Sequence, residues 1–150
     1  MYQVKGDITT YTLTRSQLYQ LYVNPANAGL VHDLYIKPCS SNIIVQLAIA
    51  RQLREAATEE LAKSSFSGVV SEEDIFRDAE NALSTLAELL SSSDWFFGQA
   101  QPSILDASIF AYTHLILDGS LQWSKNKLAE QLSQHANLSE HRSRILNRYF

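Results

Sequence analysis

Apolar and polar positions follow the period of an α-helix along most of this chain. The clearest case is residues 71–91, where apolar side chains recur at three- or four-residue steps: Ile75, Ala79, Ala82, Leu83, Leu86 and Leu90. This spacing places them on one face of a helix. The segment opens with Ser71 and three acidic residues, a sequence that favours a helix start. We therefore predict an amphipathic helix here.

Residues 103–117 show a different pattern, because their apolar side chains would lie on every side of a helix. A helix that is apolar all round is typical of the middle of a bundle, so we expect a buried central helix. Ser103 and Asp106 have the spacing of a capping box. In that motif the Ser103 hydroxyl accepts from the Asp106 N–H, and the Asp106 carboxylate accepts from the Ser103 N–H. We interpret both residues as a structural cap.

The remaining segments complete an all-α prediction, since none alternates as a strand does. Further helices are expected at 15–23, 28–36, 41–62, 123–134 and 138–149, and residues 1–13 are expected to be an extended lead-in or linker. The first half of the 41–62 helix is apolar almost all round. The pattern predicts one helical domain over residues 1–150, a single bundle of about five to seven helices.

Two stretches of the sequence resemble a known family. The run Trp95-Phe96-Phe97-Gly98, followed by Pro102-Ser103-Ile104-Leu105-Asp106-Ala107-Ser108-Ile109-Phe110, is similar to the helical C-terminal half of glutathione-transferase-like proteins. Within that superfamily it most resembles the metaxins. The last residues, 138–150, also resemble the metaxin ending.

The resemblance implies a fold and a role. It implies a glutathione-transferase C-terminal-like bundle that normally follows a thioredoxin-like half, which we do not find in residues 1–40. Metaxins are peripheral, non-catalytic subunits on the cytosolic face of the mitochondrial outer membrane, in its sorting and assembly machinery. The implied partners are a barrel-forming assembly protein, a second metaxin-like subunit and β-barrel precursor proteins.

Composition and charge argue against several classes of protein. Hydrophobic residues make up 45% of the 150 residues, and no uninterrupted apolar run reaches the roughly 18 residues of a membrane span. The N-terminus has neither a signal-peptide core nor an Arg-rich presequence. Cys39 is the only cysteine, which fits a reducing compartment. A net charge of −4 argues against nucleic-acid binding.

Charge is unevenly distributed along the chain. Residues 121–150 contain five basic and two acidic residues, a net charge of +3. A solvated helix face is the simpler interpretation. The alternative is a basic contact surface formed by Arg142, Arg144 and Arg148, which would face anionic lipid headgroups or an acidic partner.

The sequence offers no constellation for catalysis, so we predict no catalytic, cofactor-binding or metal-binding residues. The four histidines lack the i,i+4 spacing that would place two on one helix face, and Cys39 has no obvious histidine partner. We interpret Trp95, Phe96 and Phe97 as packing residues rather than a ligand pocket. Two alternatives remain open: the hydrophobic-substrate half of a glutathione transferase, and a transferase-like adaptor in a cytosolic complex.

Overall fold

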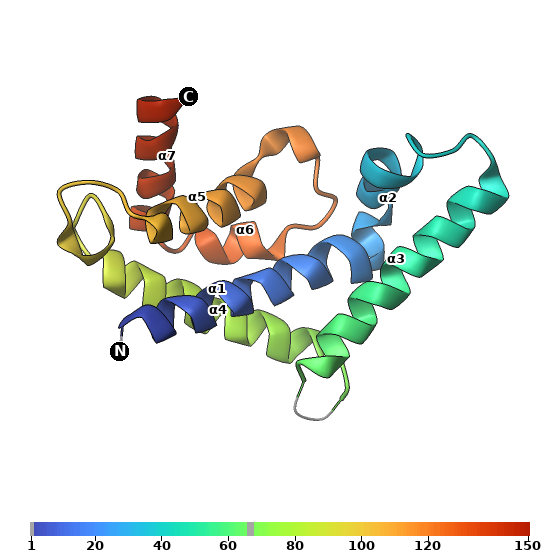
Figure 1. The fold of residues 1–150 in the computed structure, drawn as a ribbon, viewed down its shortest axis with the longest axis horizontal. Coiled ribbons are helices and arrows are strands. Elements are labelled where there is room, and N and C mark those ends of the chain that lie inside the picture. The colour runs from blue at the N-terminus through green and yellow to red at the C-terminus, as the bar shows by residue number, and fades with distance from the viewer. Residues whose placement is uncertain (1, 66–67) are drawn as a thin grey trace.

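Helices account for the regular structure of the chain. The computed structural model describes residues 2–65 and 68–150, with side chains from residue 9 onward. Within these ranges there is no strand, and the α-helices are α1 (Tyr2–Leu18), α2 (Ala28–Val31), α3 (Ile43–Lys63), α4 (Glu72–Leu90), α5 (Ile104–Leu117), α6 (Lys127–Leu132) and α7 (Ala136–Tyr149) (Figure 1). The all-α prediction is confirmed.

The prediction of an extended segment over residues 1–13 is wrong, because α1 begins at Tyr2. Two features explain the helix. Hydroxyl groups bond to carbonyls one turn back, as Thr14 does to Thr10 at 2.9 Å, and so remain compatible with helix. Leu13 is buried where α1 packs against α4. Tertiary packing therefore outweighs the low helix propensity of the threonines.

Short helical turns connect α1 to α3. A π-helical turn, η1 (Tyr19–Val23), ends α1, and the 3-10 turn η2 (Pro25–Asn27) follows. The Asn24 side chain caps η2 by accepting from the Ala26 N–H at 3.0 Å. After α2, the turn η3 (His32–Ile36) leads into the loop before α3. The first helical stretch thus ends at Val23, as the predicted bounds of 15–23 require, and Pro25 prevents its continuation.

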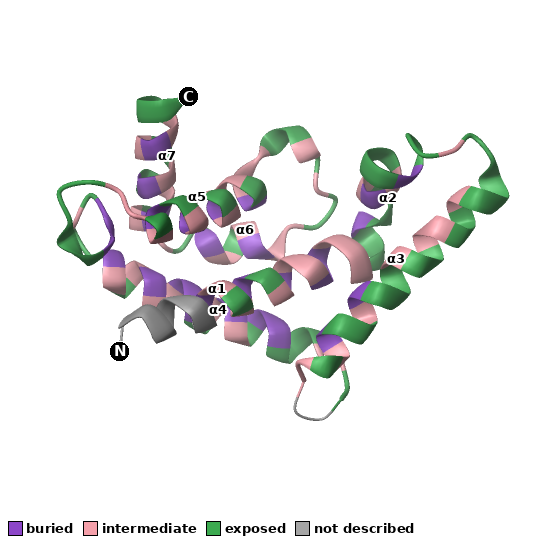
Figure 2. Ribbon diagram, viewed as in Figure 1, coloured by how far each residue is buried: buried purple, intermediate pink, exposed green. Residues whose placement is uncertain are grey.

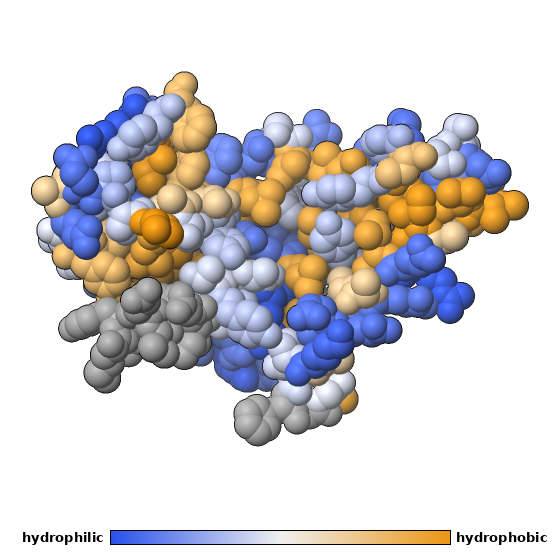
Figure 3. All heavy atoms as spheres, in the orientation of Figure 1, coloured by the Kyte–Doolittle hydropathy of each residue, from blue (hydrophilic) through white to orange (hydrophobic). Residues whose placement is uncertain are grey.

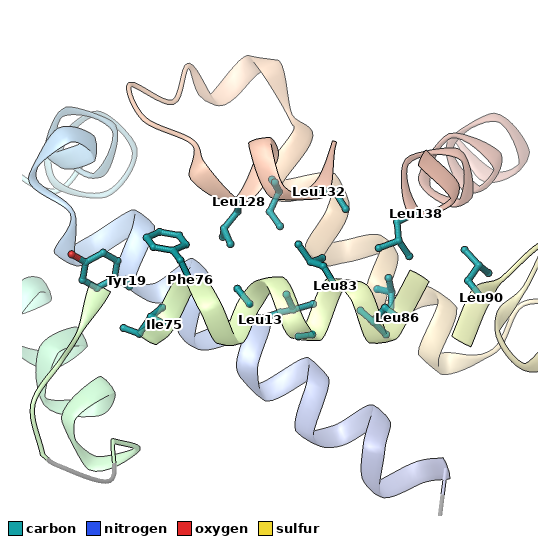
Figure 4. Packing of buried hydrophobic residues seen from close by; sticks show 14 of the residues in the cluster. Leu13, Tyr19, Ile75, Phe76, Leu83, Leu86, Leu90, Leu128, Leu132 and Leu138 are labelled. Atoms are coloured by element: carbon teal, nitrogen blue, oxygen red, sulfur yellow. The ribbon is translucent and has the colours of Figure 1, made fainter. Parts of the chain in front are cut away.

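The core forms around α4, whose buried face is the one that the sequence predicts. Figure 4 shows α4 side chains meeting those of α1, α6 and α7. The cluster includes Leu13, Phe76, Leu83, Leu86, Leu90, Leu128, Leu132 and Leu138. Ser71 caps α4, because its side chain accepts from the Asp74 N–H at 3.3 Å. Helix α6 is shorter than the predicted 123–134, since Asn126 caps it and fixes its start at Lys127.

The prediction that residues 103–117 are buried on every side is wrong for one face. Ile109, Thr113 and Ile116 of α5 are buried, and α5 packs against α1, α6 and α7. The opposite face is uncovered: Ile104 is 87% exposed and Leu115 is 38% exposed. Figure 2 shows this mixture of buried and exposed positions along α5. The helix therefore lies at the surface of the bundle rather than at its centre.

Helix α3 is divided in the same way along its length. Its second half buries Ala57 and Leu61, whereas its first turns are exposed. Figure 1 shows that these first turns, beside α2, lie at the end of the molecule farthest from α7.

Candidate functional site

The predicted capping box at the start of α5 is present. The Ser103 N–H donates to Asp106 Oδ2 at 2.8 Å, and the Asp106 N–H donates to the Ser103 hydroxyl at 3.5 Å. The hydroxyl in turn donates to Asp106 Oδ2 at 2.7 Å. The capping interpretation of both residues is confirmed.

Asp106 also makes contacts that the capping motif does not predict. Its second oxygen, Oδ1, accepts from the Phe96 N–H at 3.0 Å and lies 2.9 Å from His141 Nε2. Asp106 and His141 are both fully buried. The carboxylate therefore joins three segments: the aromatic turn before α5, α5 itself and α7.

Aromatic rings enclose this polar cluster. The rings of Trp95 and Phe96 meet the His141 ring edge-on, with centroids 5.9 and 5.3 Å away. Trp95 is 4% exposed and Phe96 is fully buried. The turn that carries them closes at Gly98, whose positive φ of 63° suits glycine. The packing interpretation agrees with the burial of Trp95 and Phe96, but it does not hold for Phe97, which is 42% exposed.

The surroundings shift the pKa values of both ionisable groups in the cluster. Burial alone raises the pKa of Asp106, but hydrogen bonds from Phe96, Ser103 and His141 together lower it below its ordinary value. Burial lowers the pKa of His141, and the Asp106 carboxylate only partly opposes this. His141 Nδ1 is buried and has no hydrogen-bond partner within residues 2–65 and 68–150. We infer a neutral imidazole that donates to an ionised carboxylate.

The cluster is arranged for structure rather than for bond chemistry. The Ser103 hydroxyl donates to Asp106 and not to His141, so no histidine is placed to take its proton. In the described ranges no group of three or more His, Cys, Asp or Glu side chains is placed to hold a metal ion. What the geometry can do is fix α7 against the start of α5.

The three arginines of the predicted basic surface do not lie together. Arg144 and Arg148 both lie over the ring of Trp95, at 5.8 and 5.7 Å from its centroid. Arg144 also donates to the Asp94 carbonyl at 2.7 Å. Arg142 lies on another side of α7, where its Nη2 is 3.3 Å from His114 Nδ1. All three are engaged in intramolecular contacts, and whether any of them contacts lipid stays a prediction.

Sequence reasoning missed two exposed apolar surfaces. One is the outer face of α5, and the other is the start of α3, where Ile44 is 74% exposed and Leu47 is 64% exposed. Figure 3 shows strongly hydrophobic atoms at the end of the molecule formed by these α3 turns. A signal was present in the sequence, because residues 43–50 are apolar on all sides of their helix. In a helix bundle, however, that pattern predicts a buried helix, so the exposure of these residues was not predicted.

The second half of the chain is similar to known proteins. A family model described as "Glutathione S-transferase, C-terminal domain" matches residues 79–145. The chain is 37% identical over 79 residues to metaxin-1 of Macaca fascicularis and of Homo sapiens. It is 35% identical over the same length to metaxin-1 of Mus musculus.

Over this part the chain is similar to the metaxins and to the C-terminal domain of glutathione transferases. The matched region contains the start of α5, α5 and most of α7, the elements that the Asp106 cluster joins. The fold is accordingly a glutathione-transferase C-terminal-like helical bundle. The alignment covers 53% of this chain, but only 24% of the macaque metaxin-1 and 16% of the human one. In the described residues no helix is long and apolar enough to cross a membrane.

Proposed function

We propose that this protein acts as a non-catalytic subunit of the mitochondrial outer-membrane sorting and assembly machinery. It would lie on the cytosolic face of that membrane. There it would dock with the barrel-forming assembly protein and a second metaxin-like subunit, and help β-barrel precursors to be recognised and inserted. The observation that carries the proposal is the 37% identity to metaxin-1 over 79 residues.

The polar cluster supports a role without bond chemistry. Its only carboxylate accepts hydrogen bonds from Ser103, Phe96 and His141, so its acceptor sites are occupied. Trp95 and Phe96 are buried against it. A general base needs an accessible acceptor within reach of a substrate. Asp106 does not offer one.

Co-purification from mitochondria tests the proposal. The full-length parent protein, tagged and extracted in mild detergent, should co-purify with the barrel-forming protein and a second metaxin-like subunit. A cytosolic glutathione transferase with the same tag serves as the control. Mitochondria depleted of the parent should insert radiolabelled β-barrel precursors more slowly. Failure to associate with either subunit, or unchanged insertion after depletion, would contradict the proposal.

One observation favours a second candidate, because the family model that matches residues 79–145 is described by the transferase domain. The alternative is that the chain supplies the substrate-side half of a glutathione transferase. It requires the full-length parent to bind glutathione, which calorimetry measures directly. A cytosolic location in cell fractionation would instead favour the third option, a transferase-like adaptor in a cytosolic complex.

A further inference from the structure

The start of α3 forms one end of the molecule, and several large apolar side chains there are exposed to solvent. We call this surface the α3 tip and define it as Leu34, Tyr35, Ile43, Ile44, Val45 and Leu47. Their exposed fractions range from 42% for Leu34 to 74% for Ile44. Soluble proteins rarely expose a contiguous cluster of large apolar side chains to water, so such a cluster marks an interaction site.

The exposed side chains cover more than one face of the helix, and only the side that carries Gln46, Ile49 and Ala50 is partly buried. Successive residues of an α-helix are turned by about 100°, so Ile43, Ile44 and Val45 point in three directions. All three are exposed, and so are Leu47 and Ala48. A flat partner surface would cover only one of these directions. The α3 tip instead suits a medium that can enclose it.

Charge around the α3 tip is positive on balance. Residues 34–54 contain three of the chain's twelve Lys and Arg residues and none of its sixteen Asp and Glu residues. These cations, Lys37, Arg51 and Arg54, are all exposed. Two acids lie just outside this range: Asp33 is 3.4 Å from His32, and Glu55 forms an exposed ion pair with Arg51 at 2.7 Å. Exposed pairs of this kind are weak, so phosphate can replace the carboxylate.

The first turn of α3 adds to this positive field. It contains no acidic residue, so the partial positive charge at the helix N-terminus is uncompensated there. The net charge of the whole chain is −4. This end is therefore positive although the molecule as a whole is acidic, and it is attracted to an anionic surface.

We propose that the α3 tip inserts into the headgroup region of an anionic lipid bilayer. Residues 43–49 span about 10 Å of helix, which matches the roughly 5–10 Å to which interfacial helices enter the headgroup and acyl boundary. Arg51 lies about 10 Å along α3 from Ile44, at the level where phosphates would then lie. Tyr35, whose ring is 6.0 Å from that of Tyr22, supplies an amphipathic ring of the kind found at such boundaries.

A second copy of this chain fits the α3 tip less well. Symmetric pairing would bring the Lys37, Arg51 and Arg54 side chains of both copies to one interface, and like charges there disfavour it. This lipid contact rests on the proposed function, since it would attach a peripheral subunit to the membrane at a second place. It concerns a different contact from docking to the barrel-forming protein.

The only cysteine of the chain lies beside the α3 tip and allows a direct test. Cys39 is exposed in the loop before α3, so an environment-sensitive fluorophore attached there reports on insertion. The labelled chain is mixed with phosphatidylcholine vesicles with or without phosphatidylserine. We expect a blue shift of the emission and flotation with the anionic vesicles only. Each of Arg51→Gln and Arg54→Gln should weaken binding about fivefold, a change of about 1 kcal/mol.

Matched variants separate the α3 tip from apolar surface in general. Ile44→Asp combined with Leu47→Asp should weaken vesicle binding by about tenfold or more. Ile104→Asp places the same change on the exposed face of α5 and should leave binding unchanged. Both variants alter exposed side chains, and unchanged circular dichroism verifies that they fold.

Three results would overturn the inference. The first is absence of flotation, and the second is equal effects of the α3 tip and α5 variants. The third is loss of association with the barrel-forming protein in the α3 tip variants while vesicle binding is unchanged, which would assign the surface to a protein partner. Co-purification that persists without vesicle binding would leave the proposed function intact and remove only the lipid contact.

Discussion

Several buried interactions converge on Asp106. A cap by itself is worth about 1–2 kcal/mol, and this is what the Ser103–Asp106 spacing alone predicts. In the structure the same carboxylate also accepts from the Phe96 N–H and from His141, both buried. Removing it would leave buried donors without an acceptor, which costs more than the loss of a cap.

Asp106→Ala should therefore lower the free energy of unfolding by about 3 kcal/mol. Asp106→Asn keeps an oxygen that can accept from Phe96 or His141 but places an NH2 group toward Ser103, so its loss should be intermediate. Urea unfolding monitored by circular dichroism measures both. If Asp106→Ala lost no more than 1 kcal/mol, the contacts to Phe96 and His141 would carry no net stability.

His141 makes stability depend on pH. Its folded-state pKa lies below the ordinary value of 6.5, mainly because burial disfavours the charged ring. The unfolded chain then binds the proton more readily, so acid favours unfolding. Stability is fully present above about pH 7.5 and falls as the pH drops through the unfolded-state value. The pKa of Asp106 is also lowered. Protonation of its carboxylate therefore causes a further loss of stability as the pH falls below about 4.

His141→Gln tests this because the glutamine amide can still donate to Asp106 but does not titrate. The wild-type chain should lose stability between about pH 7.5 and pH 5.5, and the variant should lose distinctly less. Urea unfolding at the two pH values gives the comparison, with the other histidines common to both proteins. An identical pH dependence in the two would show that His141 is not the titrating group.

At the scale of elements, α5 shows how far a pattern of apolar residues can be interpreted. The sequence correctly predicts a helix and its first residue, because both depend on contacts within one turn. It gives no information on how many neighbours the helix has. The residues on the uncovered face are as apolar as those on the buried face: Ile104 is 87% exposed, whereas Ile109 is fully buried.

The two faces of α5 should respond differently to substitution. Ile109→Ala should lower the free energy of unfolding by about 3 kcal/mol, through lost burial and the cavity that it leaves. Ile104→Ser should change it by less than about 0.5 kcal/mol, because that side chain is already in water. Thermal and urea unfolding compare the pair. A large loss for Ile104→Ser would mean that a neighbour covers this face in solution.

At the scale of the whole molecule, a buried polar joint connects the first part of the chain to the last. Asn27 is fully buried. Its Nδ2 donates to the carbonyls of Gln20 and Lys125, each at 2.9 Å, and its Oδ1 accepts from the Lys125 N–H at 3.1 Å. Gln20 in turn accepts from the Leu128 N–H at 3.1 Å. These bonds hold the turns after α1 against the start of α6.

Asn27→Ala should cost about 3 kcal/mol, because it leaves the backbone groups of Lys125 without their partners. Asn24→Ala is the matched control. Asn24 is also buried but makes only the local cap of η2, so its loss should be about 1 kcal/mol. Equal losses for the two variants would contradict a role of Asn27 in joining distant segments.

The sequence by itself determined the features that depend on neighbours within about one helical turn. These are the all-α class, the buried face of α4, the Ser71 cap and the Ser103–Asp106 box. Each is fixed by side chains three or four positions apart, where chain connectivity sets the distance.

Only the tertiary structure decided what lies next to each element. Asp106 and His141 are 35 positions apart and Asn27 and Lys125 are 98 apart, so no local signal shows that the pairs meet. The same holds for α1, whose threonine-rich sequence becomes a helix packed along α4, and for the α3 tip, whose apolar residues remain exposed. The physical reason is that every apolar side chain is stabilised by leaving water, whereas the packing of the helices decides which apolar side chains become buried.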